Sequence, residues 1–222
     1  MGSKNENKRM LVAFDMDGTI IDGRLVFALA DNLGLSEKVR EIQGNQNLYG
    51  YEQSRIIAHL FKGLPSTDII RGIESINLMK NCERLVRELK EQGHVLGIIS
   101  DSYDIAANYI AAKLNFDFCE ANTLELDENR KLTGNITMPL GWQKIGCYCK
   151  ISVCKRYFLQ KNVQEFQIDP ACTVAVGDTK SDLCMIESAK IGIAFMPKHR
   201  ILEERADALI KEPDLANLRQ LI

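Results

Sequence analysis

The sequence predicts an α/β fold, in which a doubly wound parallel sheet carries an inserted helical segment and a small β-hairpin. Three observations predict it. An apolar run, Leu11–Phe14, ends directly before two carboxylates, and such runs are typical of buried parallel strands. From residue 82 onward, strand-like and helix-like segments alternate. Between these two parts, about fifty residues have helical patterns alone.

The first predicted strand ends at a pair of carboxylates. Asp15 and Asp17 stand one residue apart, and Gly18 and Thr19 follow them. Open α/β sheets bind ligands at the carboxyl ends of their strands, and a glycine there lets the backbone turn sharply. Buried carboxylates need a cation, a proton or several hydrogen-bond donors. The alternative is a polar turn that closes an ordinary strand, but Asp-x-Asp-Gly-Thr occurs by chance in about one chain of this size per thousand. The pair therefore predicts a metal site, with one carboxylate as a candidate nucleophile.

Residues 22–77 are expected to form a helical insert, with residues 1–21 and 78–222 as the core domain. Helices are expected over 24–33, from 37 onward, over 51–61, and from 66 or 67 onward. Gly34, Gly63 and Pro65 separate them, and Ser36 is expected to cap the second helix. Because this stretch begins directly after the two carboxylates, the insert is expected to emerge beside them as a cap.

The remaining segments alternate between helix and strand patterns, as in βαβ units. Helices are expected over 82–92, 104–114, 150–161 and 181–189, and buried strands over 94–99, 172–176, 191–195 and 208–210. Two further strand-like stretches, 116–126 and 131–138, flank the turn at 127–129 and predict a β-hairpin flap.

The composition is that of an ordinary globular protein. The 222 residues suffice for one sizeable core, with 45% hydrophobic and 26% charged residues. The net charge of −2 gives no basic footprint for nucleic acid, and no run is long enough to span a membrane. The polar start, Met1–Arg9, lacks the apolar core of a signal peptide and predicts a frayed tail. We therefore expect a cytoplasmic monomer or homodimer without a nucleic-acid or membrane partner.

The chain has seven cysteines, and an odd number without a secretory signal predicts free thiols. Cys147, Cys149 and Cys154 cluster in the sequence, which is one mark of a soft-metal site. There is no Cys-x-x-Cys pair, however, and Cys154 lies on a helical pattern. These features favour reduced cysteines that pack as small hydrophobic side chains.

Polar residues also follow two later strands. Ser100 follows one of them, and Asp178 follows another, with Asp182 four residues further on. Because the carboxyl ends of parallel strands share one edge of a sheet, these side chains are expected to approach Asp15 and Asp17. Two or three carboxylates with water form an oxygen-rich site suited to Mg²⁺. The ion would bring a dianionic phosphate next to a carboxylate, while the Ser100 hydroxyl, turn amides and a lysine could hold the phosphate oxygens.

These ordered motifs resemble those of the haloacid dehalogenase-type (HAD) phosphatases. They are Asp15-x-Asp17-Gly18-Thr19, Ser100, Lys150 and Gly177-Asp178-x3-Asp182. Four further stretches are similar to the phosphoserine phosphatase subgroup: Tyr51-Glu52-Gln53-Ser54, Tyr103-Asp104-Ile105-Ala106, Lys131-Leu132-Thr133-Gly134 and Thr173-Val174-Ala175-Val176-Gly177-Asp178. The resemblance runs from Leu11 to the C-terminus and implies a Rossmann-like, HAD-like sheet with a helical cap.

The resemblance implies a role for each motif. Asp15 would take up the phosphoryl group as an aspartyl-phosphate, and Asp17 would protonate the leaving alcohol and then activate water. The Asp15 carboxylate, the Asp17 main-chain carbonyl and the Asp178 carboxylate would bind Mg²⁺, with Asp182 supporting them.

Thr19, Ser100 and a lysine are implied to contact the phosphate. Lys150 is preferred, because it is expected to open a helix and so to point at the sheet edge. Lys155 is the alternative, and it fits the usual spacing to Asp178 only if residues 162–166 are not an insertion.

The positions that recognise serine differ from the subgroup. There, a cap glutamate holds the substrate amine and a cap arginine holds its carboxylate, whereas Arg24 and Ala58 stand at the matching positions here. Asp101 and Ser102 stand where two glycines usually follow Ser100. Losing a buried charge partner costs on the order of several kcal/mol, so O-phosphoserine is expected to be a poor substrate. Arg24 favours a substrate with an extra anionic or polar group, and Asp101 disfavours an acidic one unless it is turned outward.

We therefore expect a Mg²⁺-dependent phosphatase that acts on a small-molecule phosphate ester. A phosphotransferase that passes the phosphoryl group to another alcohol is the first alternative. A non-catalytic protein that binds a phosphate ligand is the second, although a pure binder has no need of Asp17.

Overall fold

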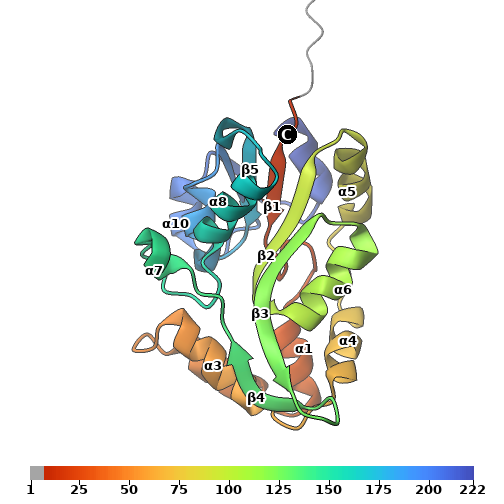
Figure 1. Ribbon diagram of the computed structural model, residues 1–222, viewed down its shortest axis with the longest axis vertical. Helices are drawn as coiled ribbons and strands as arrows, with labels where there is room; N and C mark the ends of the chain where they lie inside the picture. Colours follow the sequence, from red (N-terminus) through yellow and green to blue (C-terminus); the bar gives the residue numbers. More distant parts are fainter. Residues whose placement is uncertain (1–7) are drawn as a thin grey trace, which may run out of the picture.

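The computed structural model describes residues 8–222, which form one sheet of seven strands in the order β4-β3-β2-β1-β5-β6-β7 (Figure 1). The paired strands are parallel except β3 and β4, which are antiparallel. This architecture confirms the predicted α/β class. Most of the tail expected at Met1–Arg9 lies outside the described residues. The strands are β1 (Leu11–Phe14), β2 (Val95–Tyr103), β3 (Phe118–Leu126), β4 (Leu132–Thr137), β5 (Thr173–Gly177), β6 (Ile191–Phe195) and β7 (Ala208–Ile210).

Strand β1 is fully buried because helices cover both faces of the sheet at its centre. Leu11 and Ala13 pack in a cluster with α8 (Lys155–Glu165) and α9 (Leu183–Ile186). Val12 and Phe14 pack on the opposite face with α5 (Cys82–Glu91) and α6 (Asp104–Leu114). This two-sided burial explains the continuous apolar run in the sequence. The strand order reverses beside β1, so the carboxyl ends of β1 and β5 lie at the topological switch point, where such sheets bind ligands.

Four helices lie between β1 and α5: α1 (Leu25–Asn32), α2 (Ser36–Gly44), α3 (Gly50–Leu60) and α4 (Ser66–Glu74). The chain enters and leaves this insert through two segments that run side by side. The Asp22 N–H donates to the Asn77 carbonyl at 2.8 Å, and the Met79 N–H donates to the Ile20 carbonyl at 2.8 Å. Ser36 was wrongly expected to cap the second helix. It lies inside α2, and its hydroxyl bonds to the Asp31 carboxylate of the preceding segment.

The hairpin β3–β4 is present where it was predicted, and it packs against the insert. The Gly63 N–H donates to the Leu132 carbonyl, and the Leu132 N–H donates to the Leu64 carbonyl, both at 2.8 Å. Helix α3 lies along β4 (Figure 1). The hairpin thus joins the insert to the far edge of the sheet.

Two elements near the strand ends differ from the prediction. Strand β2 does not stop at residue 99 but continues to Tyr103, and its register with β3 shifts after Ile99. Helix α8 begins at Lys155 rather than at Lys150. Lys150 has a left-handed backbone (φ 47°), and after it Val153 forms an isolated β-bridge with Leu140, whose carbonyl accepts from the Cys154 N–H at 2.7 Å. A helix cannot begin until these constraints end.

The remaining elements are short. They are α7 (Trp142–Ile145), α10 (Arg200–Arg205) and the 3₁₀ turns Pro170–Cys172, Lys180–Asp182 and Leu215–Gln220. The helix expected over 181–189 is therefore one of these turns followed by the four-residue α9.

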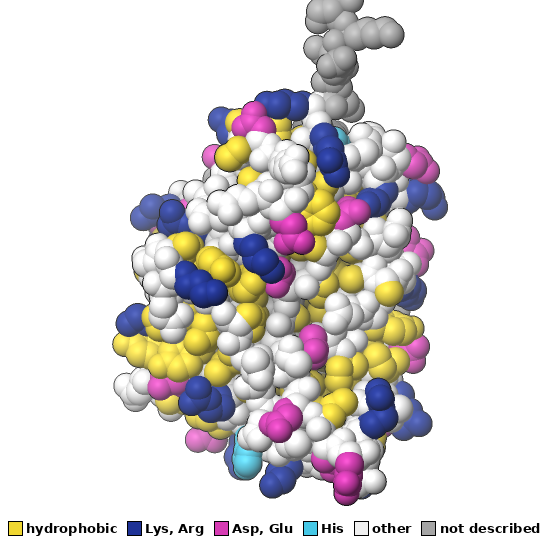
Figure 2. All heavy atoms as spheres, in the orientation of Figure 1, with side chains coloured by type: hydrophobic (Ala, Val, Ile, Leu, Met, Phe, Trp, Pro, Cys, Tyr) yellow, Lys and Arg dark blue, Asp and Glu magenta, His cyan; other side chains and the backbone are white. Residues whose placement is uncertain are grey.

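Aromatic side chains connect the insert to the loop around α7. The ring centroids of Tyr49 and Tyr51 lie 6.0 Å apart, and those of Tyr51 and Trp142 also lie 6.0 Å apart. Figure 2 shows hydrophobic atoms gathered on this side of the molecule, among basic and acidic side chains. Over residues 8–222, none of the helices has the length and apolarity needed to cross a membrane.

Candidate active site

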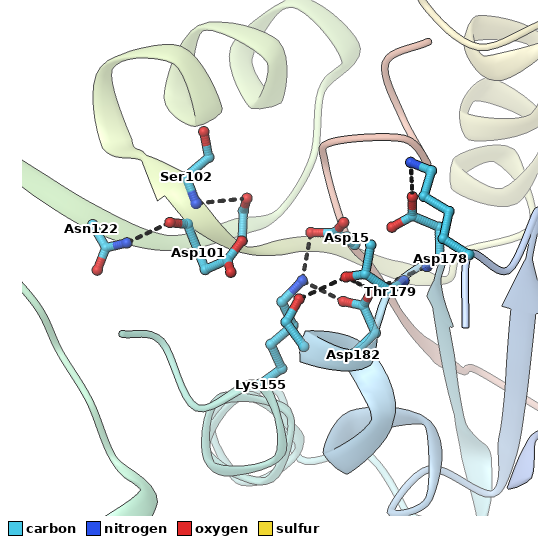
Figure 3. A network of polar contacts seen from close by, with 11 residues as sticks. Asp15, Asp101, Ser102, Asn122, Lys155, Asp178, Thr179 and Asp182 are labelled. Carbon is cyan, nitrogen blue, oxygen red and sulfur yellow. Dashed lines mark hydrogen bonds and ion pairs between the residues drawn. The ribbon is translucent and has the colours of Figure 1, made fainter. Parts of the chain in front are cut away.

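The predicted carboxylates meet at the switch point of the sheet (Figure 3). Asp15 follows β1 directly, and its N–H donates to the Val176 carbonyl of β5 at 2.9 Å. Asp178 follows β5, and Asp182 lies in the 3₁₀ turn behind it. Asp15, Asp178 and Asp182 are all buried, and each offers a carboxylate oxygen within 4.8 Å of the other two.

Gly18 allows the chain to turn beside these carboxylates. Its φ is +81°, in the left-handed region that favours glycine. A Cβ at this position would lie 2.2 Å from the Asp178 Oδ2 atom and 2.8 Å from the Lys198 Nζ atom. The turn after Asp17 therefore brings the backbone closer to Asp178 than any side chain would permit.

Lys155 projects from the first turn of α8 into the carboxylate cluster (Figure 3). Its side chain is fully buried, and its ammonium donates to Asp15 Oδ1 at 2.5 Å and to Asp182 Oδ1. Burial opposes the charge of Lys155, but Asp15 and Asp182 hold its pKa well above the usual value. The lysine therefore remains a cation in contact with the candidate nucleophile.

Lys150 does not reach the site, so the preference for Lys150 over Lys155 was wrong. Its ammonium donates to the Tyr49 hydroxyl at 3.2 Å and lies 4.2 Å from the Tyr49 ring centroid. The reason is the late start of α8, which places Lys150 in the preceding loop and Lys155 at the helix entry.

Asp182 holds the turn that carries Asp178. Its Oδ2 atom accepts from the backbone N–H groups of Thr179 (2.8 Å) and Asp178 (3.1 Å), while Lys155 occupies Oδ1. With both oxygens engaged, Asp182 is placed to orient its neighbours rather than to be a primary metal ligand.

Asp178 has one oxygen to spare. Oδ2 accepts from the Lys198 ammonium at 2.5 Å, whereas the buried Oδ1 has no hydrogen-bond partner among residues 8–222. Burial and the charge of Asp182 raise the pKa of Asp178 to about 6. A buried carboxylate oxygen without a donor is a natural cation ligand.

Burial and the Asp182 charge also raise the pKa of Asp15 well above its ordinary value. The three carboxylates thus carry more negative charge than Lys155 and Lys198 balance, and a hard divalent cation fits the cluster. Asp15 and Asp178 would supply oxygens, together with the Asp17 carbonyl that follows in the same turn.

Asp17 lies between the core and the insert. Its Oδ1 atom accepts from the Leu25 N–H at 2.6 Å, at the start of α1. Burial raises the pKa of Asp17, although the Leu25 N–H works in the other direction. A raised pKa favours the protonated carboxyl that a general acid requires.

Ser100 and Asp101 lie in the irregular part of β2. Ser100 is fully buried, and its hydroxyl oxygen accepts from the Ser102 N–H at 3.1 Å. The Asn122 side-chain amide of β3 donates to the Asp101 carbonyl at 2.6 Å. The register of β2 with β3 shifts along this stretch, and such irregularities are common next to active sites. Thr19 is also fully buried, and its hydroxyl has no partner within the described chain.

A small cavity adjoins Asp17, between the insert and the core. Arg24, Ser54 and Ile57 line it from the insert, and Asp101 and Ser102 line it from β2. The Arg24 guanidinium donates to the Gln43 side chain at 3.2 Å. Because Asp101 lines the cavity, it faces inward. Ala58 does not line the cavity, and it is fully buried in the core cluster.

Sequence reasoning missed Lys198, Asn122 and Thr179, although they contact Asp178, Asp101 and Asp182, respectively. Lys198 could have been found, because it comes shortly after β6 at the carboxyl edge of the sheet. Nothing in the sequence singles out Asn122, since its role follows from the register of β3 with β2.

Comparisons with known proteins agree with this geometry. A model of the haloacid dehalogenase-like hydrolase family matches residues 12–187. The phosphoserine phosphatase of Methanocaldococcus jannaschii is 33% identical over 220 residues, which cover 98% of this chain and 99% of that protein. The phosphoserine phosphatase of Archaeoglobus fulgidus is 31% identical over 223 residues, which cover 98% of this chain and 61% of that protein.

Two solved structures are similar over almost the whole chain. A substrate-bound phosphoserine phosphatase complex superposes with a TM-score of 0.84 at 30% identity. The match covers 97% of this chain and 99% of the chain in that structure. A phospho-aspartyl intermediate analogue of phosphoserine phosphatase superposes with a TM-score of 0.83 at 30% identity, with the same coverage.

Proposed function

Because the chain belongs to the haloacid dehalogenase-like hydrolase family and is a phosphatase similar to phosphoserine phosphatases, we propose that it hydrolyses a small phosphate monoester through a phosphoryl group carried on Asp15. The observation that supports this most directly is the contact between Asp15 and the buried Lys155. Asp15 also lies close to Asp178 in space, and Asp17 follows it by two residues in the sequence. A nucleophile, an acid and a buried cation are thus available at one sheet edge.

The first half-reaction transfers the phosphoryl group to the protein. An Asp15 carboxylate oxygen attacks phosphorus, and the bond from phosphorus to the ester oxygen breaks. The leaving alkoxide takes the proton of Asp17, whose raised pKa keeps that proton available. Lys155 holds the Asp15 carboxylate in position, and the buried Ser100 and Thr19 hydroxyls would hold phosphate oxygens.

The second half-reaction restores the enzyme. Asp17, now a carboxylate, takes a proton from water as the water oxygen attacks phosphorus. The bond between phosphorus and Asp15 breaks, and inorganic phosphate leaves. When bound by Asp15, the Asp17 carbonyl and Asp178, Mg²⁺ would supply Lewis-acid stabilisation of the phosphoryl charge.

Residues 22–77 act in this proposal as a cap that selects the substrate. Arg24 lines the cavity as its cation, no carboxylate of the insert lines it, and Asp101 faces it from the core. We therefore expect a substrate with an additional polar group rather than an acidic one, and slow hydrolysis of O-phosphoserine.

The test is a panel of phosphate esters assayed for phosphate release after removal of divalent metal, and then with Mg²⁺ or Ca²⁺ added. We expect turnover of at least one ester with Mg²⁺ alone, because Ca²⁺ takes more ligands at longer distances. Full activity in excess chelator would contradict the metal requirement. A phosphorylated alcohol acceptor as the main product would instead identify a phosphotransferase, and tight binding without turnover would identify a binding protein.

A further inference from the structure

Four cysteines meet outside the active site, on the side of α8 that faces α7. Cys147 and Cys149 lie in the loop after α7, Cys154 directly precedes α8, and Cys184 lies in α9. All four sulfur atoms lie within 4.8 Å of one another. The fourth member could not be recognised from the sequence, because Cys184 is separated from the other three by strand β5.

The spacing of the sulfur atoms fits a single metal ion. A tetrahedral zinc site has Zn–S bonds of about 2.3 Å, which places its sulfur atoms about 3.8 Å apart. Every pair in this cluster lies within 4.8 Å, so small side-chain adjustments bring all four to one ion. An iron–sulfur cluster needs more room, because several irons and sulfides lie between the thiolates. A tetrahedral set of four sulfur ligands selects zinc among the common single ions.

The N-terminus of α8 favours a thiolate in this cluster. Cys154 is the N-cap residue of α8, an eleven-residue helix whose N-terminal dipole favours an anion.

The surroundings are those of a closed structural site. Cys147, Cys154 and Cys184 are buried and pack with Trp142, Ile145 and Tyr157. No disulfide links any of the seven cysteines, all of which lie within the described residues. We propose that Cys147, Cys149, Cys154 and Cys184 bind one zinc ion as four thiolates, with loss of their protons to solvent.

This site would join three parts of the fold that contribute to the active site. Cys154 is next to Lys155 in the chain, and Cys184 comes two residues after Asp182. The loop between Cys149 and Cys154 also contacts the insert, where the Tyr51 N–H donates to the Lys150 carbonyl at 3.3 Å. A zinc ion here would therefore fix the entry of α8 relative to α9 and α3.

The proposal is tested on the full-length protein by elemental analysis after gel filtration, without reference to activity. We expect about one zinc per chain. After removal of the metal under reducing conditions, Co²⁺ should give the intense visible bands of tetrahedral thiolate coordination. Zinc should then displace Co²⁺ and abolish these bands.

Serine variants locate the ion. Cys184→Ser and Cys149→Ser should each lower bound zinc several-fold and weaken the Co²⁺ bands. Cys172→Ser is the matched control, because Cys172 is a buried free thiol outside the cluster, and it should keep about one zinc per chain. Asp15→Asn should also keep its zinc, which separates this site from the carboxylate cluster.

Three results would overturn the proposal. The first is purified wild-type protein with almost no zinc, whose reduced form gives no tetrahedral Co²⁺ bands. This measurement needs no variant and so does not depend on whether the serine variants fold. The second is a mass decrease that shows disulfides among these cysteines in the untreated protein. The third is iron, rather than zinc, as the bound metal.

Discussion

At the scale of single residues, the site is dominated by a buried lysine between two carboxylates. Lys155 and Asp182 have fully buried side chains, and Asp15 is almost as buried. Removing one partner from such a group leaves an uncompensated buried charge, which typically costs about 3–5 kcal/mol. These three side chains are therefore coupled in stability as well as in chemistry.

Asp15→Asn is expected to abolish turnover while the protein stays folded. The amide is a poor nucleophile, and losses on the order of a thousand-fold or more accompany removal of a catalytic nucleophile. Phosphate release and thermal melting check the two parts of this prediction. Asp22→Asn, at an exposed position near the same turn, is the control and should keep its activity. Substantial activity in Asp15→Asn would rule out the covalent route.

Lys155→Met and Lys150→Met are expected to differ sharply. Loss of Lys155 removes the cation that contacts Asp15, so kcat should fall by about 10²–10³. Loss of Lys150 removes a contact with Tyr49 on the surface of the insert, so kcat should stay close to that of the wild type. Steady-state kinetics on both variants measures this difference. An equal loss of kcat in the two variants would contradict the assignment of Lys155 to the active site.

The sequence was sufficient to place Asp15 and Asp178 directly after strands, because buried strands have a clear apolar pattern and end at polar residues. It was not sufficient to choose the lysine. That choice depends on the start of α8, which is set by the backbone of Lys150 and by a hydrogen bond from Cys154 to the distant Leu140. Local helix propensity contains no information about such a contact.

At the scale of elements, the C-terminal 3₁₀ turn is held by one charged cap. Asp214 accepts hydrogen bonds from the Ala216 N–H at 2.9 Å and the Asn81 side chain at 2.7 Å, and Lys80 forms an ion pair with it at 2.8 Å. These contacts, with Asn81 the largest, lower the pKa of Asp214 from 3.8 to about 2. The cap therefore connects this turn to the segment that precedes α5.

The stability contributed by Asp214 should depend on pH with a definite sign. Its pKa is lower in the folded protein, so the contribution is present above pH 3.8 and is lost as the pH falls through about 2. The free energy of unfolding of Asp214→Asn should thus lie below that of the wild type at about pH 5 and converge with it near pH 2. Denaturant titrations at several pH values measure this. Glu37→Gln, on the exposed side of α2, should show no such convergence.

Element boundaries were predicted well where the local apolar pattern is clear, as for β6 and β7. They were predicted poorly where tertiary contacts decide. Strand β2 continues past Ile99 because β3 offers partners as far as Asn122, across a register shift. Residues 100–103 have no strand pattern of their own, so only the neighbouring strand explains their conformation.

At the scale of the whole molecule, the cavity beside Asp17 is shared by the insert and the core. Arg24 and Ser54 come from the insert, and Asp101 and Ser102 come from the sheet edge. The reacting carboxylates belong to the core alone. In the proposed mechanism, phosphoryl chemistry therefore depends on the core, whereas substrate choice depends on both the insert and the core.

O-phosphoserine is expected to have a lower kcat/KM than the best ester of the panel. Arg24→Glu should raise the kcat/KM for O-phosphoserine by about tenfold, equivalent to about 1.4 kcal/mol, because a carboxylate would then face the ammonium group. Arg40→Glu is the control, since Arg40 also lies near Phe27 but does not line the cavity. If O-phosphoserine proves to be the best substrate of the wild type, the interpretation of Arg24 is wrong.

The two hydrogen-bonded segments that lead into and out of the insert have an evolutionary consequence. The Asp22 N–H donates to the Asn77 carbonyl, and the Met79 N–H donates to the Ile20 carbonyl. The ends of the insert are therefore joined, and for the core the insert is a closed loop. The entropy of closing a loop grows only logarithmically, by about 0.6 kcal/mol for each doubling of its length. Inserts of very different size can therefore replace one another at nearly constant cost to the sheet. Proteins with these two joined segments can exchange the insert, and so change which substrate they recognise, while the residues that break the phosphate ester stay in place.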